Sequence, residues 1–283
     1  MNAQRWAWAE IDLGALRHNV EALAAHIGPQ QLWAVVKADA YGHGAIECAR
    51  VALQSGAHGL CVALVSEGIA LRQAGINAPI LIMSEQPAEQ HRDIISYGLI
   101  ATLYNEATIT QFASTAHELE IMASVHMKVD SGMHRVGVPP EDAVKVAKLI
   151  AESPWLSLEG VFTHLATADV ADTQFAQQQV SAFSRSVEQV RACGIEVRHV
   201  HVSNSASAIR RLDAGAGAWP VAKCRPGRSE TCCYATSKVA GSEADGAAQR
   251  QGCCGPGASA SPRRACGACP RGYCACVDRD AQG

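Results

Sequence analysis

The chain has 283 residues, enough for one large domain and a smaller one, and a formal net charge of −3. That charge, with basic residues scattered rather than grouped in a stripe, gives no reason to expect a nucleic-acid partner. The sequence has no apolar run of about eighteen residues, and residues 1–11 lack the apolar core of a signal peptide. We therefore expect a cytoplasmic protein without a membrane-spanning helix.

Two elements are predicted near the N-terminus. Residues 6–11 alternate between apolar and polar side chains, as a strand does. Asp12 can cap the helix that follows, because its side-chain oxygen can accept a hydrogen bond from a free N–H group of the first turn. The apolar residues of that helix recur on one face, at Leu13, Leu16, Val20 and Leu23.

Short apolar runs alternate with amphipathic stretches along the next part of the chain. We expect seven strands, at residues 32–36, 59–64, 79–83, 99–103, 122–129, 158–164 and 197–202. Helical patterns fall between them at residues 46–53, 67–73, 141–150 and 175–193, the second with Ser66 as N-cap. Each helix can complete a right-handed crossover, so the class is α/β and the architecture a (β/α)8 barrel of the TIM type, with one strand still to be found.

A lysine stands at the end of the first predicted strand. Residues 34–44 read Ala-Val-Val-Lys-Ala-Asp-Ala-Tyr-Gly-His-Gly, and the apolar run before Lys37 predicts a strand buried on both faces. In a barrel of parallel strands the catalytic residues lie at this end, because the loops after the strands converge there. After Tyr41, the bare backbone of Gly42 and Gly44 lets a phosphate approach N–H groups. The ordinary alternative is a lysine with its amine in solvent.

Three later segments also place polar side chains after strands. Residues 128–137 read Lys-Val-Asp-Ser-Gly-Met-His-Arg-Val-Gly, residues 162–166 read Phe-Thr-His-Leu-Ala, and residues 201–206 read His-Val-Ser-Asn-Ser-Ala. Taken alone, they are compatible with solvated charges beside a loop, a core histidine and a helix cap, respectively. Gly132 and Gly137, however, bracket Arg135 as a tight loop requires.

The segment around Lys37 resembles the pyridoxal phosphate attachment site of alanine racemases, whose motif is Val-Lys-Ala-(Asn/Asp)-Ala-Tyr-Gly-His-Gly. The resemblance implies that Lys37 forms an internal aldimine with the cofactor and that Tyr41 contacts its phosphate. Residues 128–137 resemble the racemase segment Lys-Val-Asp-(Thr/Ser)-Gly-Met-x-Arg-x-Gly. By that resemblance Arg135 hydrogen-bonds the phenolic oxygen of the cofactor and lies near the substrate carboxylate, as a planar, always charged guanidinium can. Lys128, carbamylated in some members, would hold Arg135 in place.

The same resemblance implies the other cofactor-binding residues. His164 would pack against the pyridine ring and hydrogen-bond Arg225, which stands in an Arg-Pro-Gly tripeptide like that of the family. Asn204 and Ser205 match the family's Asn-Ser-Ala, in which the serine binds phosphate beside a helix N-terminus. Arg225 would face the pyridine nitrogen and keep it unprotonated, which suits racemisation. Gly227 would add a backbone contact to the phosphate.

The activity implied is the interconversion of L-alanine and D-alanine through a pyridoxal phosphate aldimine and an α-carbanion, which supplies D-alanine for the bacterial cell wall. Family members are homodimers. Racemisation needs one base to remove the α-proton and another, on the opposite face, to return it. Lys37 serves one face, and in the family a tyrosine in a Ser-Tyr-Gly context, from the second domain of the partner subunit, serves the other. Tyr234 and Tyr273 do not match its context, so the alternative is a pyridoxal phosphate-binding barrel without racemase activity.

Residues 213–283 differ in composition from the rest of the chain. They contain no Leu, Ile, Phe or Met and hold nine of the twelve cysteines. Burial of their few apolar side chains therefore offsets little of the conformational entropy that ordering would cost. We predict a largely disordered tail, rich in Cys, Gly, Ala and Arg, in place of the family's β-rich domain. The expected domains are residues 1–12, a strand that packs on that second domain in the family, residues 13–212, the cofactor-binding barrel, and residues 213–283. The eighth strand is expected near residues 220–225.

The family pattern breaks off after Arg-Pro-Gly, where Arg-Ser-Glu-Thr-Cys-Cys replaces an aliphatic residue and Leu-Tyr-Gly. We hypothesise a change of reading frame or source gene between residues 212 and 228. Translation of the other two frames tests this, and the hypothesis fails if neither gives an aliphatic sequence containing Tyr and Gly. A third interpretation is a zinc-binding or interaction protein, because the tail has thiols at close spacing, at Cys266, Cys269, Cys274 and Cys276. An out-of-frame, GC-rich translation would itself be rich in cysteine, so we expect no metal site.

Overall fold

The fold is described from a computed structural model that places residues 9–212 and 221–223, the last three as backbone alone. The chain divides into two compact units, and every described residue belongs to the unit Ala9–Lys238. Apart from residues 221–223, the tail predicted to be disordered lies outside the described residues, as do its cysteines.

The described part of the chain alternates strands with helices. Its strands are β1 (Leu32–Val35), β2 (Ala57–Val62), β3 (Ile80–Ile82), β4 (Ala101–Leu103), β5 (Ala123–Lys128), β6 (Leu156–Phe162), β7 (His199–His201) and β8 (Val221–Lys223). Its helices are α1 (Leu13–Ile27), α2 (Lys37–Gly42), α3 (Ala45–Gln54), α4 (Val65–Gln73), α5 (His91–Ser96), α6 (Glu106–Leu119), α7 (Ala143–Ala151), α8 (Gln174–Ala192) and α9 (Ser205–Arg210), with short 3-10 turns at Ala88–Gln90 and Pro140–Asp142.

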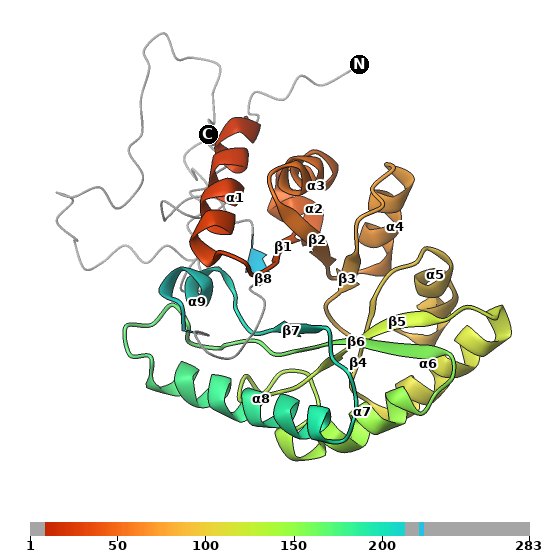
Figure 1. The fold of residues 1–283 in the computed structure, drawn as a ribbon. Coiled ribbons are helices and arrows are strands. Elements are labelled where there is room, and N and C mark those ends of the chain that lie inside the picture. Colours follow the sequence, from red (N-terminus) through yellow and green to blue (C-terminus); the bar gives the residue numbers. More distant parts are fainter. Residues whose placement is uncertain (1–8, 213–220, 224–283) are drawn as a thin grey trace, which may run out of the picture. The chain divides into compact units, whose positions relative to one another are not determined.

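All the strand pairs described are parallel. They form two runs, β3-β2-β1-β8 and β4-β5-β6-β7, and a parallel bridge between Leu81 and Ile100 joins the two where β3 meets β4. The helices lie outside the strands (Figure 1), which is the arrangement of a (β/α)8 barrel. The predicted α/β class and TIM-type barrel are therefore confirmed. The eighth strand, β8, pairs with β1 so that Val221 lies opposite Trp33, and it falls inside the predicted range 220–225.

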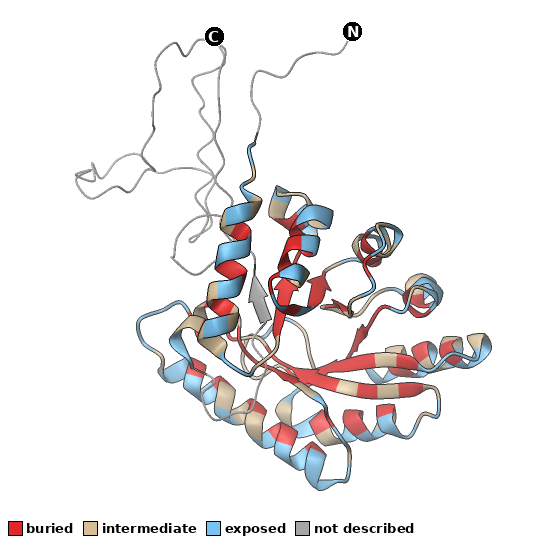
Figure 2. Cartoon of the chain, turned by 45° about the horizontal axis from the view of Figure 1, so that its top comes forward, coloured by how far each residue is buried: buried red, intermediate tan, exposed pale blue. Residues whose placement is uncertain are grey.

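Alternate residues of β1 belong to two different hydrophobic clusters. Trp33 and Val35 pack in a small inner cluster with residues of neighbouring strands, whereas Leu32 and Ala34 join the large cluster that includes the apolar faces of the helices. All four residues are buried, as expected for a parallel strand covered on both faces. Figure 2 shows that the strands are buried along most of their length, whereas the helices have exposed outer faces.

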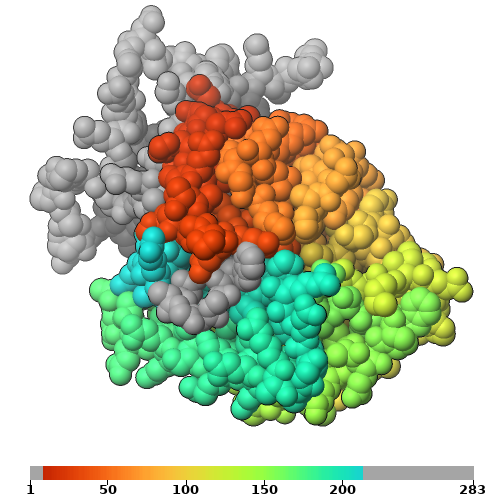
Figure 3. Space-filling view, in the orientation of Figure 1, coloured from red at the N-terminus to blue at the C-terminus, as the bar shows by residue number. Residues whose placement is uncertain are grey.

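The first helix forms as its sequence predicts. The Asp12 carboxylate accepts a hydrogen bond from the Ala15 N–H group at 2.9 Å, and Leu16, Val20 and Leu23 are buried. α1 packs against α3 and α9, and Figure 3 shows these elements as neighbours on the surface. Residues 9–12, in contrast, form no strand, and the rest of the strand expected at residues 6–11 lies outside the described residues.

Two details of the helices differ from the predictions. Ser66 is not an N-cap: α4 begins at Val65, and its cap residue is Leu64, whose N–H group donates to the Glu67 carboxylate. α5 and α6 were not predicted at all, although Asn105 caps α6 by accepting from Ala107 N at 2.9 Å. The expected helices at residues 46–53, 67–73, 141–150 and 175–193 are confirmed with small shifts of their ends.

Aromatic and imidazole rings fill part of the space between the strands. Trp33, His126 and His201 are completely buried, and their ring centroids lie 5.0 to 5.9 Å apart. A Cβ atom at Gly160 would lie 2.7 Å from the His126 ring, so a glycine is needed there to make room for the imidazole.

Candidate functional site

Lys37 lies at the C-terminal end of β1, where the loops of a parallel barrel converge. Its side chain is half-buried. The residues that follow it form a left-handed turn: Ala38, Asp39, Ala40 and Tyr41 have φ angles of 51° to 59°. Such a conformation costs an L-residue other than glycine about 1–2 kcal/mol, so four in succession require support from their surroundings.

The turn is supported by hydrogen bonds along its own chain. The Asp39 carbonyl oxygen accepts from His43 N at 2.9 Å and from Gly44 N at 3.0 Å. The Asp39 carboxylate accepts from Ala45 N at 2.7 Å, which fixes the start of α3. These bonds reverse the direction of the chain, and Tyr41 packs against the inner cluster around Trp33. The predicted glycine-rich loop is thus an ordered left-handed turn that begins before its glycines.

A second loop follows β5 and carries Arg135. The Asp130 carboxylate accepts from the N–H groups of Gly132, Met133 and His134 at 3.0, 2.8 and 3.0 Å. Burial alone would raise the pKa of Asp130, but these three bonds and the nearby His134 outweigh burial and lower it. The charged carboxylate therefore holds the loop in shape.

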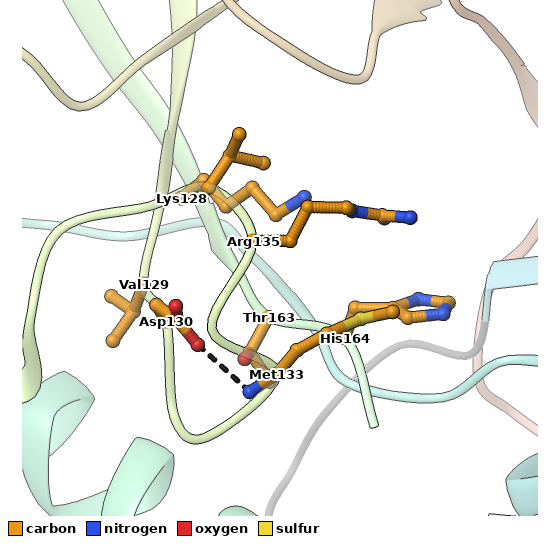
Figure 4. Close-up of a pocket in the computed structure, with 8 residues that line it drawn as sticks. Lys128, Val129, Asp130, Met133, Arg135, Thr163 and His164 are labelled. Carbon is orange, nitrogen blue, oxygen red and sulfur yellow. Dashed lines mark hydrogen bonds between the residues drawn. The ribbon is translucent and has the colours of Figure 1, made fainter. Parts of the chain in front are cut away.

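This loop, the end of β5 and the start of the loop after β6 line a pocket that includes Lys128, Arg135 and His164. In Figure 4 the side chains of Lys128, Arg135 and His164 extend to the same side, away from Asp130. The Lys128 Nζ atom lies 5.3 Å from the centroid of the Phe162 ring, while Arg135 is exposed. The space between these side chains is narrow and partly open to solvent, so the pocket accounts for only part of a cofactor site.

Asn204 caps α9 after β7. Its side-chain oxygen accepts from Ser207 N at 3.1 Å, and its Nδ2 atom donates to the carbonyl oxygen of Leu165 at 3.3 Å. The second bond links the β7 loop to the residue next to His164. Ser205, at the start of α9, is buried. The helix-cap interpretation of this segment is therefore observed, and roles of Asn204 and Ser205 toward a cofactor stay predictions.

The structure brings some of the predicted residues together. Lys128, Arg135 and His164 share one pocket, whereas Lys37, Tyr41, Asn204 and Ser205 stand at the same end of the barrel without lining it. Arg225 and Gly227 lie outside the described residues.

Sequence reasoning missed the side chains that support these loops. Gln179, buried on α8, accepts from Ala166 N at 2.9 Å and so holds the His164 segment. The hydroxyl groups of Ser131 and Thr163 are 2.8 Å apart and join the Arg135 loop to the end of β6. The Glu67 carboxylate binds three backbone N–H groups near Lys37. No local pattern marks Gln179, Ser131 or the bond from Glu67 to Ala38, because each of them acts on a segment distant in sequence.

Gly137 gives a direct test of the Arg135 loop. Its φ is +129°, and a Cβ atom there would lie 2.7 Å from the backbone nitrogen of Asp130. We expect Gly137→Ala to lower the free energy of unfolding by about 2–4 kcal/mol, because both the strained backbone and the clash oppose the loop. Urea unfolding measures this. The matched control is Gly98→Ala, also at positive φ but with nothing within 4 Å, and an equal loss in both variants would contradict the role of the clash.

Two further findings concern only the described residues. Within residues 9–212 and 221–223, no three His, Cys, Asp or Glu side chains are grouped as metal ligands would be. No helix in this part is both long and apolar enough to cross a membrane.

Comparison with known proteins gives consistent matches. The family model described as "Alanine racemase, N-terminal domain" matches residues 11–229, a range that includes Arg225 and Gly227. The alanine racemase of Desulfosudis oleivorans is 44% identical over 213 residues, covering 72% of this chain and 55% of the relative. That of Nostoc sp. is 42% identical over 207 residues, covering 72% and 54%. The chain thus spans about half the length of the curated relatives it matches.

Solved structures of the same kind share the fold. An alanine racemase of Clostridium difficile in complex with cycloserine superposes with a TM-score of 0.76 at 31% identity, covering 84% of this chain and 68% of that one. The alanine racemase from Bacillus anthracis with bound L-Ala-P gives a TM-score of 0.72 at 31% identity, covering 79% and 57%.

Proposed function

The chain belongs to the alanine racemase family, and on this premise we propose that its barrel binds pyridoxal phosphate through Lys37 and interconverts L-alanine and D-alanine. The observation that carries the proposal is the pocket that unites Lys128, Arg135 and His164 at the end of the barrel where Lys37 lies. The substrate and the activity are proposals, because the chain spans about half the length of its curated relatives.

The side chains at this end fit pyridoxal phosphate chemically. Among the described residues, neither Lys37 nor Arg135 has a carboxylate within salt-bridge distance, so both cations remain available to an anionic ligand. When bound, pyridoxal phosphate supplies an electron sink for the cleavage of a bond at the substrate α-carbon.

Each residue contributes what its chemistry allows. The Lys37 amine attaches the cofactor and holds or moves a proton on one face of the substrate. The Arg135 guanidinium offers paired donors to the oxygen atoms of the cofactor or of the substrate carboxylate. His164 offers an imidazole in the same pocket, and carbamylation of the buried Lys128 would give it a negative charge that can hold Arg135.

The second base is the open element of this proposal. The tripeptide Ser-Tyr-Gly does occur in the chain, at residues 96–98, but Tyr97 follows α5 and precedes β4. It therefore stands at the end of the barrel opposite to Lys37 and does not supply that base. Tyr234 and Tyr273 lie outside the described residues. A homodimer, the domain boundaries at residues 12 and 212, and a cytoplasmic location likewise stay proposals.

Purified full-length chain incubated with pyridoxal phosphate and either L-alanine or D-alanine tests the function. Chiral chromatography is expected to show conversion of each enantiomer into the other, at least about 100-fold faster than in a Lys37→Ala chain, because a positioned acid–base group contributes about 10²–10⁴. Cofactor binding without conversion would instead establish the alternative, a pyridoxal phosphate-binding barrel without racemase activity.

A further inference from the structure

Glu67, on the first turn of α4, makes an unusual set of hydrogen bonds. Its Oε1 atom accepts from Ala38 N at 2.6 Å, and its Oε2 atom accepts from Ala63 N at 2.8 Å and Leu64 N at 3.0 Å. The side chain is half-buried. One carboxylate therefore satisfies three backbone N–H groups from two different βα units, and hydrogen bonds to a charged acceptor are the stronger kind.

The bond from Ala38 places Glu67 at the start of the turn that follows Lys37. Ala38 directly follows Lys37 and is the first of the four left-handed residues. The later part of the turn is supported by bonds of Asp39, which belongs to the same loop. Glu67 instead fixes the beginning of the turn against the end of β2, so the backbone beside Lys37 is held by an element that is distant in sequence.

We propose that Glu67 is a positioning residue for Lys37: its carboxylate fixes the left-handed turn and thereby directs the lysine amine toward the cofactor site. This inference rests on the proposed function for the identity of the cofactor. The charge and both oxygen atoms matter, because the amide of Gln offers only one acceptor and turns an N–H group toward backbone N–H donors.

The variants Glu67→Gln and Glu85→Gln form a matched pair. The Glu85 carboxylate is also half-buried and also accepts two backbone N–H groups, from Tyr104 and Asn105 at 2.6 Å each, but it does not touch the Lys37 turn. Both replacements are expected to weaken the fold to a similar degree, and only Glu67→Gln should affect Lys37. Glu67→Asp serves as the second variant if Glu67→Gln does not fold, because it keeps the charge on α4 but is too short to reach Ala38.

Two measurements on the full chain separate the inference from the proposed function. The first is hydrogen–deuterium exchange without cofactor: Glu67→Gln or Glu67→Asp should speed exchange at residues 38–44, and Glu85→Gln should not. The second is the rate at which added pyridoxal phosphate is trapped on Lys37 by borohydride, expected to fall about 10- to 100-fold in the Glu67 variants alone, as misplacement of a reacting group does.

Unchanged exchange at residues 38–44 in the Glu67 variants, or equal slowing of trapping in Glu85→Gln, would overturn the positioning role. If the unmodified chain takes no pyridoxal phosphate on Lys37, the proposed function fails, and the exchange experiment still decides whether Glu67 fixes the turn.

Discussion

Lys37→Ala is expected to abolish the covalent capture of pyridoxal phosphate and to weaken its retention by about 10²–10⁴-fold. The reason is that covalent attachment and non-covalent contacts act together, and loss of one of two linked attachments reduces the effective affinity by about that factor. Because Lys37 is only half-buried, the change should alter the free energy of unfolding by less than about 1 kcal/mol.

Lys128 provides the control for this prediction, because it is a second amine at the same end of the barrel. It is buried, with its Nζ atom over the Phe162 ring, and it lines the pocket with Arg135 and His164. Lys128→Met should leave the covalent adduct on Lys37 in place. Equilibrium dialysis and the visible absorbance band of the covalent adduct test both variants. A band that persists in Lys37→Ala but is lost in Lys128→Met would show that Lys128, not Lys37, attaches the cofactor.

The second large effect is expected on the free energy of unfolding when the pH is lowered. Burial, and then the neighbouring His199 and His58, lower the pKa of His201 from 6.5 to about 3. Burial, and then His201 and His199, lower the pKa of His126 well below its ordinary value. Both side chains are therefore neutral in the folded chain over a range where they bind protons when unfolded. The stability they confer is complete above about pH 6.5 and is lost progressively as the pH falls toward their folded values.

The size of this effect follows from the shift. For His201 the loss is about 2 kcal/mol at pH 5 and about 5 kcal/mol at the acid limit, since one pKa unit corresponds to about 1.4 kcal/mol. His126 adds to it in the same direction. Urea unfolding at pH 7.5 and pH 5 measures the difference.

His201→Gln isolates the contribution of one histidine to the acid effect. The variant keeps every other titrating group, including Glu85. Burial raises the pKa of Glu85, so its protonation favours the folded chain as the pH falls, opposite to the effect of His201. Its loss of stability between the two pH values should be smaller by about 2 kcal/mol. Identical pH dependence in the variant and the unmodified chain would mean that His201 does not titrate as its burial requires.

The strands were predictable because a parallel barrel leaves a clear pattern in its sequence. Short apolar runs, such as residues 32–36, are buried on both faces, and polar motifs follow them directly. α6 carried an equally readable signal, with Asn105 as cap and Ile109, Phe112 and Ala116 on its buried face. The six-residue α5, in contrast, is too short to show a periodic pattern.

The support of the candidate site was not predictable from local sequence. Left-handed residues are expected at glycines, yet the turn after Lys37 forms at Ala38 through Tyr41, with Asp39 bonding its own loop and Glu67 of the next βα unit bonding Ala38. The same carboxylate, rather than the Ser66 hydroxyl, caps α4. The family match ends at residue 229, close to the point where the sequence pattern breaks off after Gly227.

Borohydride reduction of the purified full-length chain with pyridoxal phosphate, followed by peptide mass mapping, tests the central claim most directly. The expected result is a visible absorbance band that disappears on reduction, with the reduced adduct on the peptide that contains Lys37. Absence of the band, or a label spread over many lysines, would contradict the assignment of a pyridoxal phosphate site at the end of β1.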